Sequence, residues 1–241
     1  MKQIVKIFDS PEKLFLNTAQ LTHEILQSRI DINGSCSFVL SGGSTPRSLY
    51  TILGSEYKNK TSWDRVCFFW GDERCVPPDN DESNYKMAYD TLISRINISE
   101  KNVHRMPAEK PHHKAALEYE LLLKMLFSEL KYPSFDLVML GLGEDGHTAS
   151  LFNAGDMNPA DERWVKDVYS EKFDKWRITM TLPVFNNAKN IIFLVSGKNK
   201  AGIVKSVLEE KNKLLPAEHI NTYKGDLIWC LDKEAASMIN P

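Results

Sequence analysis

Short, mostly apolar runs alternate with longer amphipathic stretches along the chain. Runs of four to eight apolar residues between turn signals are typical of strands that are buried on both faces of a sheet. Six such runs are predicted to be strands, and they cover residues 5–8, 37–40, 65–70, 135–140, 191–195 and 227–231.

The stretches between these runs show helical periodicity. One helix is predicted to begin near Pro11, and its apolar residues recur from Leu14 to Leu26. The strongest helical pattern covers residues 113–130. The apolar side of that helix is formed by Leu117, Leu121, Leu122, Met125 and Leu126. Further helices are predicted from Pro46 onward, over 84–93 and over 200–209.

This alternation predicts an α/β fold with a mostly parallel, Rossmann-like sheet and helices on both faces. Three glycine-bearing turns follow predicted strands: SGG, WGDE and GLGEDGH. In open parallel sheets, ligands bind outside the carboxyl ends of the strands, so we expect these turns to meet at one site. A single domain over 1–241 is predicted. The polar segment 154–174 is interpreted as a surface excursion or a small lobe.

The amino-acid composition argues against several classes of protein function. The 241 residues carry a formal net charge of −2 without a long block of one sign, which argues against nucleic-acid and membrane partners. No signal peptide or membrane span is visible, so a cytoplasmic location is expected. The four cysteines form no C-x-x-C pair, which indicates reduced cysteines and not a zinc site or disulfide framework.

The first segment with candidate chemistry is SGGSTPR. Gly42 and Gly43 allow a ligand to approach the backbone, and the helix that follows points its N–H groups at an anion. Ser44 and Thr45 add hydroxyl groups, and Arg47 adds a guanidinium suited to phosphate. The segment is neither a Walker A loop nor a G-x-G-x-x-G turn. The alternative interpretation is an ordinary strand-to-helix turn.

The second segment is WGDER, where Asp72, Glu73 and Arg74 follow a strand. Three interpretations remain open. These side chains face a substrate, form an ion-pair network with one another, or make an acidic turn that is exposed to solvent. Ser83 is a candidate cap for the helix near Asn84.

The third segment, GLGEDGHTAS, places His147 after two acids in a glycine-rich turn that includes Gly143. Histidine is the usual general base or acid near neutral pH. Asp145 or Glu144 is expected to orient the imidazole. The other histidines are interpreted as surface residues.

Arg177 and Lys200, in the fourth segment, are candidate phosphate contacts or solvated charges. No G-x-S-x-G elbow, H-E-x-x-H motif or His/Cys metal cluster is present in the sequence. The chemistry that remains is acid–base catalysis on an anionic small molecule.

Four blocks, in order, resemble the glucosamine-6-phosphate isomerase/6-phosphogluconolactonase family, whose fold is sugar-phosphate isomerase-like. They span residues 40–201 and read LSGGSTPRSLY, WGDERCVPPDNDESNYKMA, FDLVMLGLGEDGHTASLF and RITMTLPVFNNAKNIIFLVSGKNKA. One departure is Asn153, which stands where the family typically has proline. It alters the turn after the motif and removes no ionisable group.

The resemblance implies hydrolysis of 6-phospho-D-glucono-1,5-lactone to 6-phosphogluconate, in the oxidative pentose phosphate pathway, without a metal or organic cofactor. His147 matches the family's proposed general base. Phosphate is expected near the SGGST turn, and Arg74 or Lys200 is expected to stabilise the oxyanion. The candidate anion contacts are Arg47, Arg74, Arg177 and Lys200.

Two alternatives remain open. The first is a glucosamine-6-phosphate deaminase or sugar-phosphate isomerase, whose histidine segment resembles G-H-I-A-F-N-E-P with a glutamate shortly after the histidine. This chain has no glutamate between Thr148 and Asn153. The second is a non-catalytic sugar-phosphate sensor, against which the retained Asp145 and His147 argue.

Overall fold

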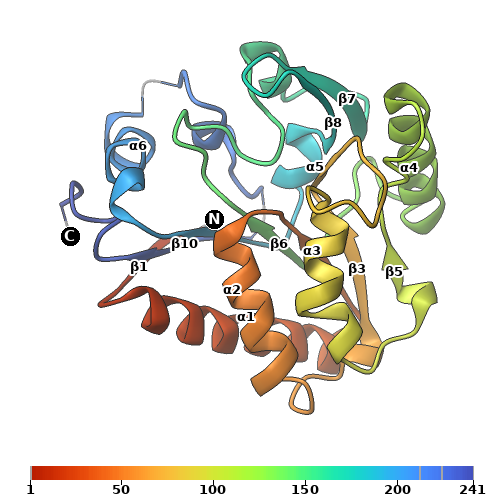
Figure 1. Ribbon diagram of the computed structural model, residues 1–241, viewed down its shortest axis with the longest axis horizontal. Helices are drawn as coiled ribbons and strands as arrows, with labels where there is room; N and C mark the ends of the chain where they lie inside the picture. The colour runs from red at the N-terminus through yellow and green to blue at the C-terminus, as the bar shows by residue number, and fades with distance from the viewer. Residues whose placement is uncertain (1, 212, 224, 241) are drawn as a thin grey trace.

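The computed structural model describes residues 2–211, 213–223 and 225–240, which form two β-sheets (Figure 1). All neighbouring strands of the larger sheet are parallel. In spatial order they are β1 (Lys2–Phe8), β10 (Asp226–Asp232), β9 (Asn190–Val195), β6 (Leu137–Leu140), β2 (Cys36–Leu40), β3 (Val66–Trp70) and β5 (Val103–His104). The six predicted strands and the parallel arrangement are therefore confirmed. The two-residue β5 in this sheet and the strands of a second, smaller sheet were not predicted.

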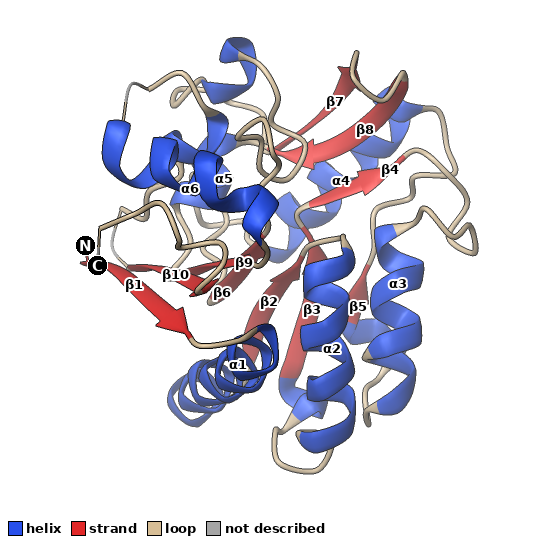
Figure 2. Cartoon of the chain, turned by 60° about the vertical axis from the view of Figure 1, so that its left-hand side comes forward, coloured by secondary structure: helices blue, strands red, loops and turns tan. Residues whose placement is uncertain are grey.

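Helices cover both faces of this sheet (Figure 2). One face packs against α1 (Pro11–Asn33), α2 (Ser44–Glu56) and α3 (Asn84–Thr91). The other packs against α4 (His112–Leu126), α5 (Leu182–Asn186) and α6 (Ala201–Lys205). Because side chains alternate along a strand, Phe38 and Leu40 join the first core while Val39 joins the second. Apolar runs without a polar face are what a sheet covered on both sides requires.

The ends of α1 show why the helix begins and ends where it does. The Ser10 side chain accepts a hydrogen bond from the backbone N–H of Lys13 at 3.3 Å, and Pro11 occupies the first turn. Gly34 ends the helix in the left-handed conformation, with φ of 76°. The predicted start at Pro11 is confirmed. None of the described helices is long and apolar enough to cross a lipid bilayer.

A second, antiparallel sheet lies beyond the carboxyl ends of the main strands (Figure 1). Its order is β4 (Asp72–Arg74), β8 (Lys175–Met180) and β7 (Val165–Ser170). The segment interpreted as an excursion, 154–174, contains a 3₁₀ turn, Ala154–Met157, followed by β7 and the turn into β8. It is therefore half of a hairpin that reaches over the central strands. The single domain over 1–241 stays a prediction.

Two helix predictions need correction. The helix predicted over 113–130 ends at Leu126, and its apolar side is not its buried side, because Leu117, Leu121 and Met125 are 50–69% exposed. The buried side carries Ala115, Ala116, Tyr119, Glu120 and Leu123. The small alanines allow close packing, and the Tyr119 hydroxyl donates to the carbonyl oxygen of His104 at 3.1 Å. The helix predicted over 200–209 divides into α6 and a π-helical turn, Ser206–Glu210.

All four cysteines are free, as predicted. Burial raises the pKa of the Cys230 thiol to about 11 and that of Cys75 to about 11, so both thiols are held in the protonated form.

At the amino ends of the central strands, Asp136 ties three segments together. Its carboxylate accepts hydrogen bonds from Arg29 Nε at 3.0 Å, Lys189 Nζ at 2.8 Å, and the backbone N–H of Ser37 at 2.9 Å. Burial raises the pKa of Asp136, but the bonds from Lys189 and Ser37 outweigh it and hold the pKa below the ordinary 3.8. The ionised carboxylate therefore stabilises the fold at neutral pH.

We expect Asp136→Asn to lower the free energy of unfolding at neutral pH by about 1–2 kcal/mol, since it removes the charge but keeps the shape. The native pKa is depressed, so this contribution is complete above the ordinary value of 3.8 and is lost as pH falls through the native value. Urea denaturation at a series of pH values from about 7 down to about 3 measures this. The difference in unfolding free energy between the wild type and Asp136→Asn should shrink as pH falls. Asp64→Asn, which breaks an exposed pair with Arg65, is the control. A constant difference across the range would contradict the assignment.

Candidate functional site

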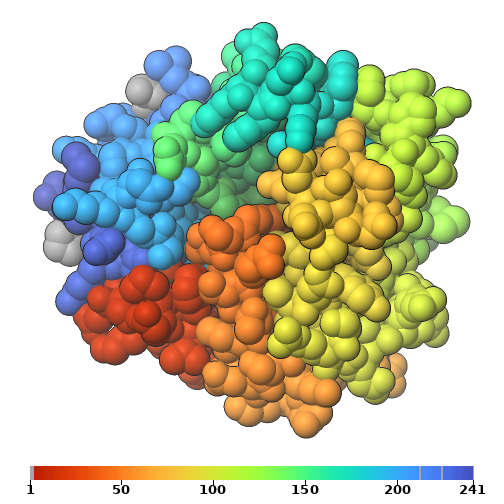
Figure 3. All heavy atoms as spheres, in the orientation of Figure 1, coloured from red at the N-terminus to blue at the C-terminus, as the bar shows by residue number. Residues whose placement is uncertain are grey.

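The three predicted turns meet at the carboxyl edge of the main sheet. They follow β2, β3 and β6, which are adjacent parallel strands, so their ends lie side by side. Together with residues after β9 and the β7–β8 turn they enclose a pocket of about 360 Å³. In Figure 3 the surface is hollowed where the orange start of α2, the blue residues after β9 and the β7–β8 segment approach one another. The pocket is lined by these predicted residues: Gly42, Gly43, Ser44, Thr45, Asp72, Arg74, Gly143, His147 and Lys200.

The start of α2 lines the pocket and is suited to bind an anion. No side chain caps the helix, and Ser44 and Thr45 in its first turn both line the pocket. A helix N-terminus with free N–H groups attracts negative charge. Gly42 has no room for a side chain, because a Cβ there would lie 1.7 Å from Asn84 Oδ1. Close packing of Asn84 against Gly42 thus fixes the entry to the helix.

His147 is held against Asp145 in the turn after β6. Its Nδ1 pairs with Asp145 Oδ1, and its backbone oxygen accepts from the N–H of Gly143 at 2.8 Å. A Cβ on Gly143 would lie 2.1 Å from His147 Nδ1, so glycine is required beneath the ring. If the Nδ1–H donates to the carboxylate, the lone pair of the neutral imidazole is on Nε2. Among the described residues, none bonds to Nε2, which leaves it available to a water or substrate.

The Asp145 carboxylate is anionic over a wide pH range. Partial burial raises the pKa of Asp145, but hydrogen bonds from Lys172 and His147 more than offset this and hold the pKa well below its ordinary range. A carboxylate that stays ionised can orient the imidazole and stabilise it when it takes up a proton.

Asp72 and Arg74 occupy the β3 side of the pocket. Asp72 is nearly buried, and its carboxylate accepts from Ser150 Oγ at 2.7 Å and from Asn84 Nδ2 at 3.4 Å. The Arg74 guanidinium donates one bond to the backbone oxygen of Glu82, at 2.5 Å, and forms no other hydrogen bond within the described residues.

Lys200 supplies positive charge from the opposite side. Its Nζ donates to the backbone oxygen of Leu142 at 2.8 Å, which places the ammonium beside the His147 turn. Burial lowers the pKa of Lys200, although Glu144 and Asp145 act against this. The turn before Lys200 is anchored by the buried Asp232, which accepts the N–H of Gly197 at 3.0 Å.

Three predicted contacts lie outside the pocket lining. Arg47 is exposed on the first turn of α2. Glu73 is buried and accepts the backbone N–H groups of Asn84 at 2.7 Å and Tyr85 at 2.8 Å, so it caps α3. Arg177 is 8% exposed and lies under the ring of Phe173, 5.5 Å from its centroid. The predicted cap by Ser83 is present, since its Oγ accepts from Lys86 N at 3.1 Å.

Sequence reasoning missed other residues that line the pocket, chiefly Asn84, Lys172 and Phe173. Asn84 stands in one of the quoted blocks but was interpreted only as the start of a helix. Lys172 and Phe173 come from the segment to which no role was given, and no motif identifies them.

The loop after the histidine motif accommodates its unusual residue. Asn153 caps the 3₁₀ turn, and its backbone N–H donates to Asp156 Oδ2 at 3.0 Å. Proline has no N–H and would leave that oxygen without this donor. The departure therefore changes how the loop is held and leaves His147 and its partners in place.

The pocket combines an uncapped helix N-terminus, a histidine whose Nε2 bonds to no described residue, and cations on two sides. Within the described part of the chain, no group of three or more His, Cys, Asp or Glu residues could hold a metal ion. The arrangement suits attack by water on a carbonyl of a phosphorylated small molecule.

Known proteins are similar to this chain over 99–100% of its length. A sequence model of the family "Glucosamine-6-phosphate isomerases/6-phosphogluconolactonase" matches residues 9–229. The protein 6-phosphogluconolactonase 3, chloroplastic, of Arabidopsis thaliana is 35% identical, covering 99% of this chain and 76% of its own. The 6-phosphogluconolactonase of Nostoc sp. is 33% identical, with all of both chains covered. The structure of 6-phosphogluconolactonase from Trypanosoma cruzi is 30% identical and covers 100% of this chain and 98% of its own, with a TM-score of 0.88. The predicted sugar-phosphate isomerase-like α/β fold is therefore confirmed.

Proposed function

The chain belongs to the glucosamine-6-phosphate isomerase/6-phosphogluconolactonase family, and we propose that it hydrolyses 6-phospho-D-glucono-1,5-lactone with His147 as the general base. It is an enzyme of the lactonase type, and its reaction belongs to the oxidative pentose phosphate pathway. The product is 6-phosphogluconate.

One observation supports the role of His147 above the others. The imidazole is fixed to Asp145 through Nδ1, while Nε2 has no bond to a described residue and the ring lines the same pocket as the uncapped end of α2. A phosphate bound at Ser44 and Thr45 would hold the lactone in this pocket. Binding energy from the phosphate is then converted into orientation of the reacting carbonyl.

The proposed reaction needs no covalent intermediate, because a lactone is an activated ester. His147 Nε2 takes a proton from water as the oxygen attacks the carbonyl carbon. Arg74 stabilises the negative charge that develops on the carbonyl oxygen, while Lys200 is assigned to the phosphate. The tetrahedral intermediate collapses, the bond to the ring oxygen breaks, and the imidazolium returns its proton to that oxygen. The carboxylic acid product then releases one proton to the solvent.

The test of this proposal compares two substrates. Freshly prepared 6-phosphogluconolactone should release protons at near-neutral pH much faster with enzyme than without it. Glucosamine 6-phosphate should release no ammonia, because no glutamate follows His147 before Asn153. Ammonia release would select the deaminase. Tight binding of 6-phosphogluconate without turnover of either substrate would select the non-catalytic sensor.

Phosphate recognition gives a separate prediction. Lys200→Met should raise KM for the phosphorylated lactone by about 10-fold, as expected when one charged hydrogen bond is lost, and raise it less for glucono-1,5-lactone. Arg47→Met should have the smaller effect, since Arg47 is exposed and outside the pocket lining. Steady-state kinetics on both lactones measures the difference. An equal rise for both lactones in Lys200→Met would exclude a phosphate role for this lysine.

The remaining predictions concern the cellular location, the cofactors and the binding partners. A phosphorylated sugar lactone is the proposed small-molecule partner. No metal or organic cofactor enters the proposed mechanism. A cytoplasmic location and the absence of nucleic-acid and membrane partners stay predictions from composition.

A further inference from the structure

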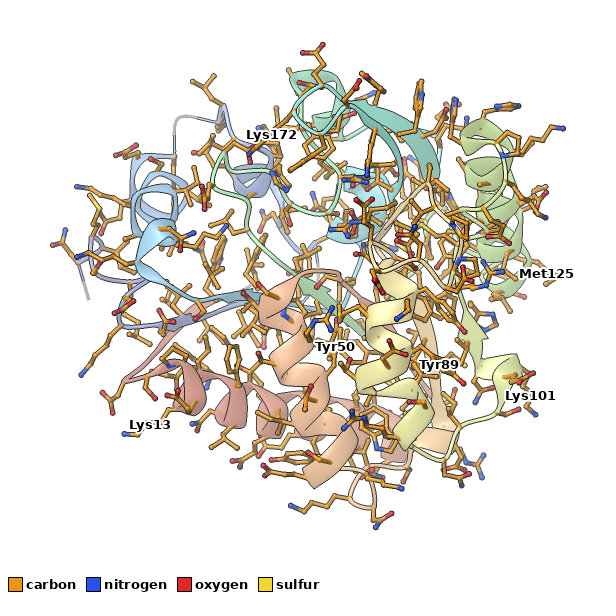
Figure 4. All side chains as sticks on the ribbon, viewed as in Figure 1. Lys13, Tyr50, Tyr89, Lys101, Met125 and Lys172 are labelled. Carbon is orange, nitrogen blue, oxygen red and sulfur yellow. The ribbon has the colours of Figure 1, made fainter. Side chains whose placement is uncertain are left out.

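The turn between β7 and β8 brings a lysine to the histidine from a distant part of the chain. Lys172 and Phe173 lie at this turn, and both line the pocket. Figure 4 shows Lys172 between the β7–β8 hairpin and the loop that follows β6. Its Nζ lies 2.8 Å from Asp145 Oδ2. The Asp145 carboxylate therefore links His147, the proposed general base, to Lys172 at the β7–β8 turn of the second sheet.

The two oxygens of Asp145 serve different partners. Oδ1 pairs with His147 Nδ1 and also accepts the backbone N–H of His147 at 3.4 Å, whereas Oδ2 pairs with Lys172. A carboxylate held at both oxygens cannot rotate about its last bond without losing one partner. The orientation of the His147 ring is thus set by a chain of contacts that begins at Lys172.

Other charged groups near this chain of contacts make their hydrogen bonds to other partners, although Lys200 also interacts electrostatically with Asp145. Glu144 accepts from Asn199 Nδ2 at 2.6 Å, and Lys200 donates to the backbone oxygen of Leu142. Within the described residues, Asp145 forms its ammonium ion pair with Lys172. Asp72 and Arg74 face the pocket from the β3 side, with contacts of their own to Ser150 and to the Glu82 carbonyl.

We propose that Lys172 is a positioning residue for the general base, and that it acts through Asp145 to hold the His147 ring and to moderate the negative charge beside it. This inference rests on the proposed function, in which His147 activates water. The positive charge of Lys172 partly offsets the negative charge that Asp145 places beside the imidazole. Without it, the imidazole binds its proton more tightly and is free to act as a base only at higher pH.

An exposed ion pair by itself contributes little, and the Lys172 side chain is 52% exposed. A second exposed ion pair on the same β7–β8 hairpin serves as a control. Lys175 is 46% exposed and pairs with Glu82 at 2.6 Å, but neither residue lines the pocket. Loss of a hairpin ion pair and loss of the link to His147 can therefore be separated by comparing the two lysines.

The experiment measures kcat/KM against pH for the wild type, Lys172→Met, Lys172→Arg and Lys175→Met, with 6-phosphogluconolactone. Lys172→Met should lower kcat/KM about 3–10-fold and move the acid limb of the profile to higher pH by about 0.5 unit, as expected for a lost charge near the surface. Lys172→Arg should retain most of the wild-type behaviour, and Lys175→Met should match the wild type. An unmoved acid limb in Lys172→Met, or an equal shift in Lys175→Met, would overturn the proposal.

A second readout does not depend on turnover. The His147 ring signal, assigned in NMR spectra by its loss in His147→Ala, is titrated in the wild type, Lys172→Met and Lys175→Met. The midpoint should rise in Lys172→Met alone. An unchanged midpoint overturns the role of Lys172 even if the enzyme is an active lactonase. A shifted midpoint in a protein without lactonase activity would instead refute the proposed function.

Discussion

Replacing His147 with alanine is expected to lower kcat for 6-phosphogluconolactone by about 10²–10⁴-fold, the usual contribution of a general acid–base residue. The reason is that Nε2 is the ring nitrogen left free by the pairing of Nδ1 with Asp145. KM should change little, because the anion-binding end of the pocket at Ser44 and Thr45 is untouched. Proton release above the uncatalysed background measures both constants.

The matched control is His113→Ala, since His113 is exposed on α4 and does not line the pocket. It should retain wild-type kinetics. The assignment of His147 as the base is wrong if His147→Ala retains near-normal kcat. A large rise in KM with normal kcat would instead make His147 a binding residue.

Gly143→Ala is expected to give the second large effect, a fall in kcat of about 10²-fold with little change in melting temperature. The added Cβ would lie 2.1 Å from His147 Nδ1 and 2.7 Å from Asp145 Oδ1, closer than real Cβ contacts. The imidazole ring and the Asp145 carboxylate must therefore both move away from the new methyl group. Displacing a catalytic group by about 1 Å is enough to cost that much rate.

Gly202→Ala is the control for this substitution. Gly202 lies in α6, where a Cβ would meet nothing within 4 Å, and alanine favours a helix over glycine. Activity should be unchanged and stability equal or slightly higher. Normal activity in Gly143→Ala, with a wild-type melting temperature, would mean that the position of the His147 ring is not critical.

The sheet and the place of the site could be predicted because both depend on local pattern. Apolar runs such as 191–195 have no polar face, which is typical of strands in a parallel sheet covered on both sides. The carboxyl ends of such strands share one edge, so the turns bearing Gly42, Asp72 and His147 had to lie close together.

The direction of individual side chains could not be predicted. Arg47 follows Ser44 by three residues, which places it about 4.5 Å further along the helix axis, and its side chain is exposed outside the pocket lining. Glu73 points away from its neighbours Asp72 and Arg74 because successive strand residues face opposite sides.

Contacts between distant segments were also beyond prediction. Lys172 reaches Asp145 only because β7 pairs with β8 and β8 pairs with β4. The strand pattern of β7 is weak, and no motif marks the turn. On α4, helical spacing was identified, but periodicity does not reveal which apolar side meets the core, and Met125 points away from it (Figure 4).

The measurement that tests the central claim most directly is the ratio of kcat/KM for 6-phosphogluconolactone to that for glucono-1,5-lactone, with the wild-type protein. Phosphate bound at the N-terminus of α2 beside Lys200 should raise this ratio to about 10² or more, the worth of two or more charged hydrogen bonds. A ratio near one, or rates at the uncatalysed background for both lactones, would contradict a pocket that binds phosphate in order to present a lactone to His147.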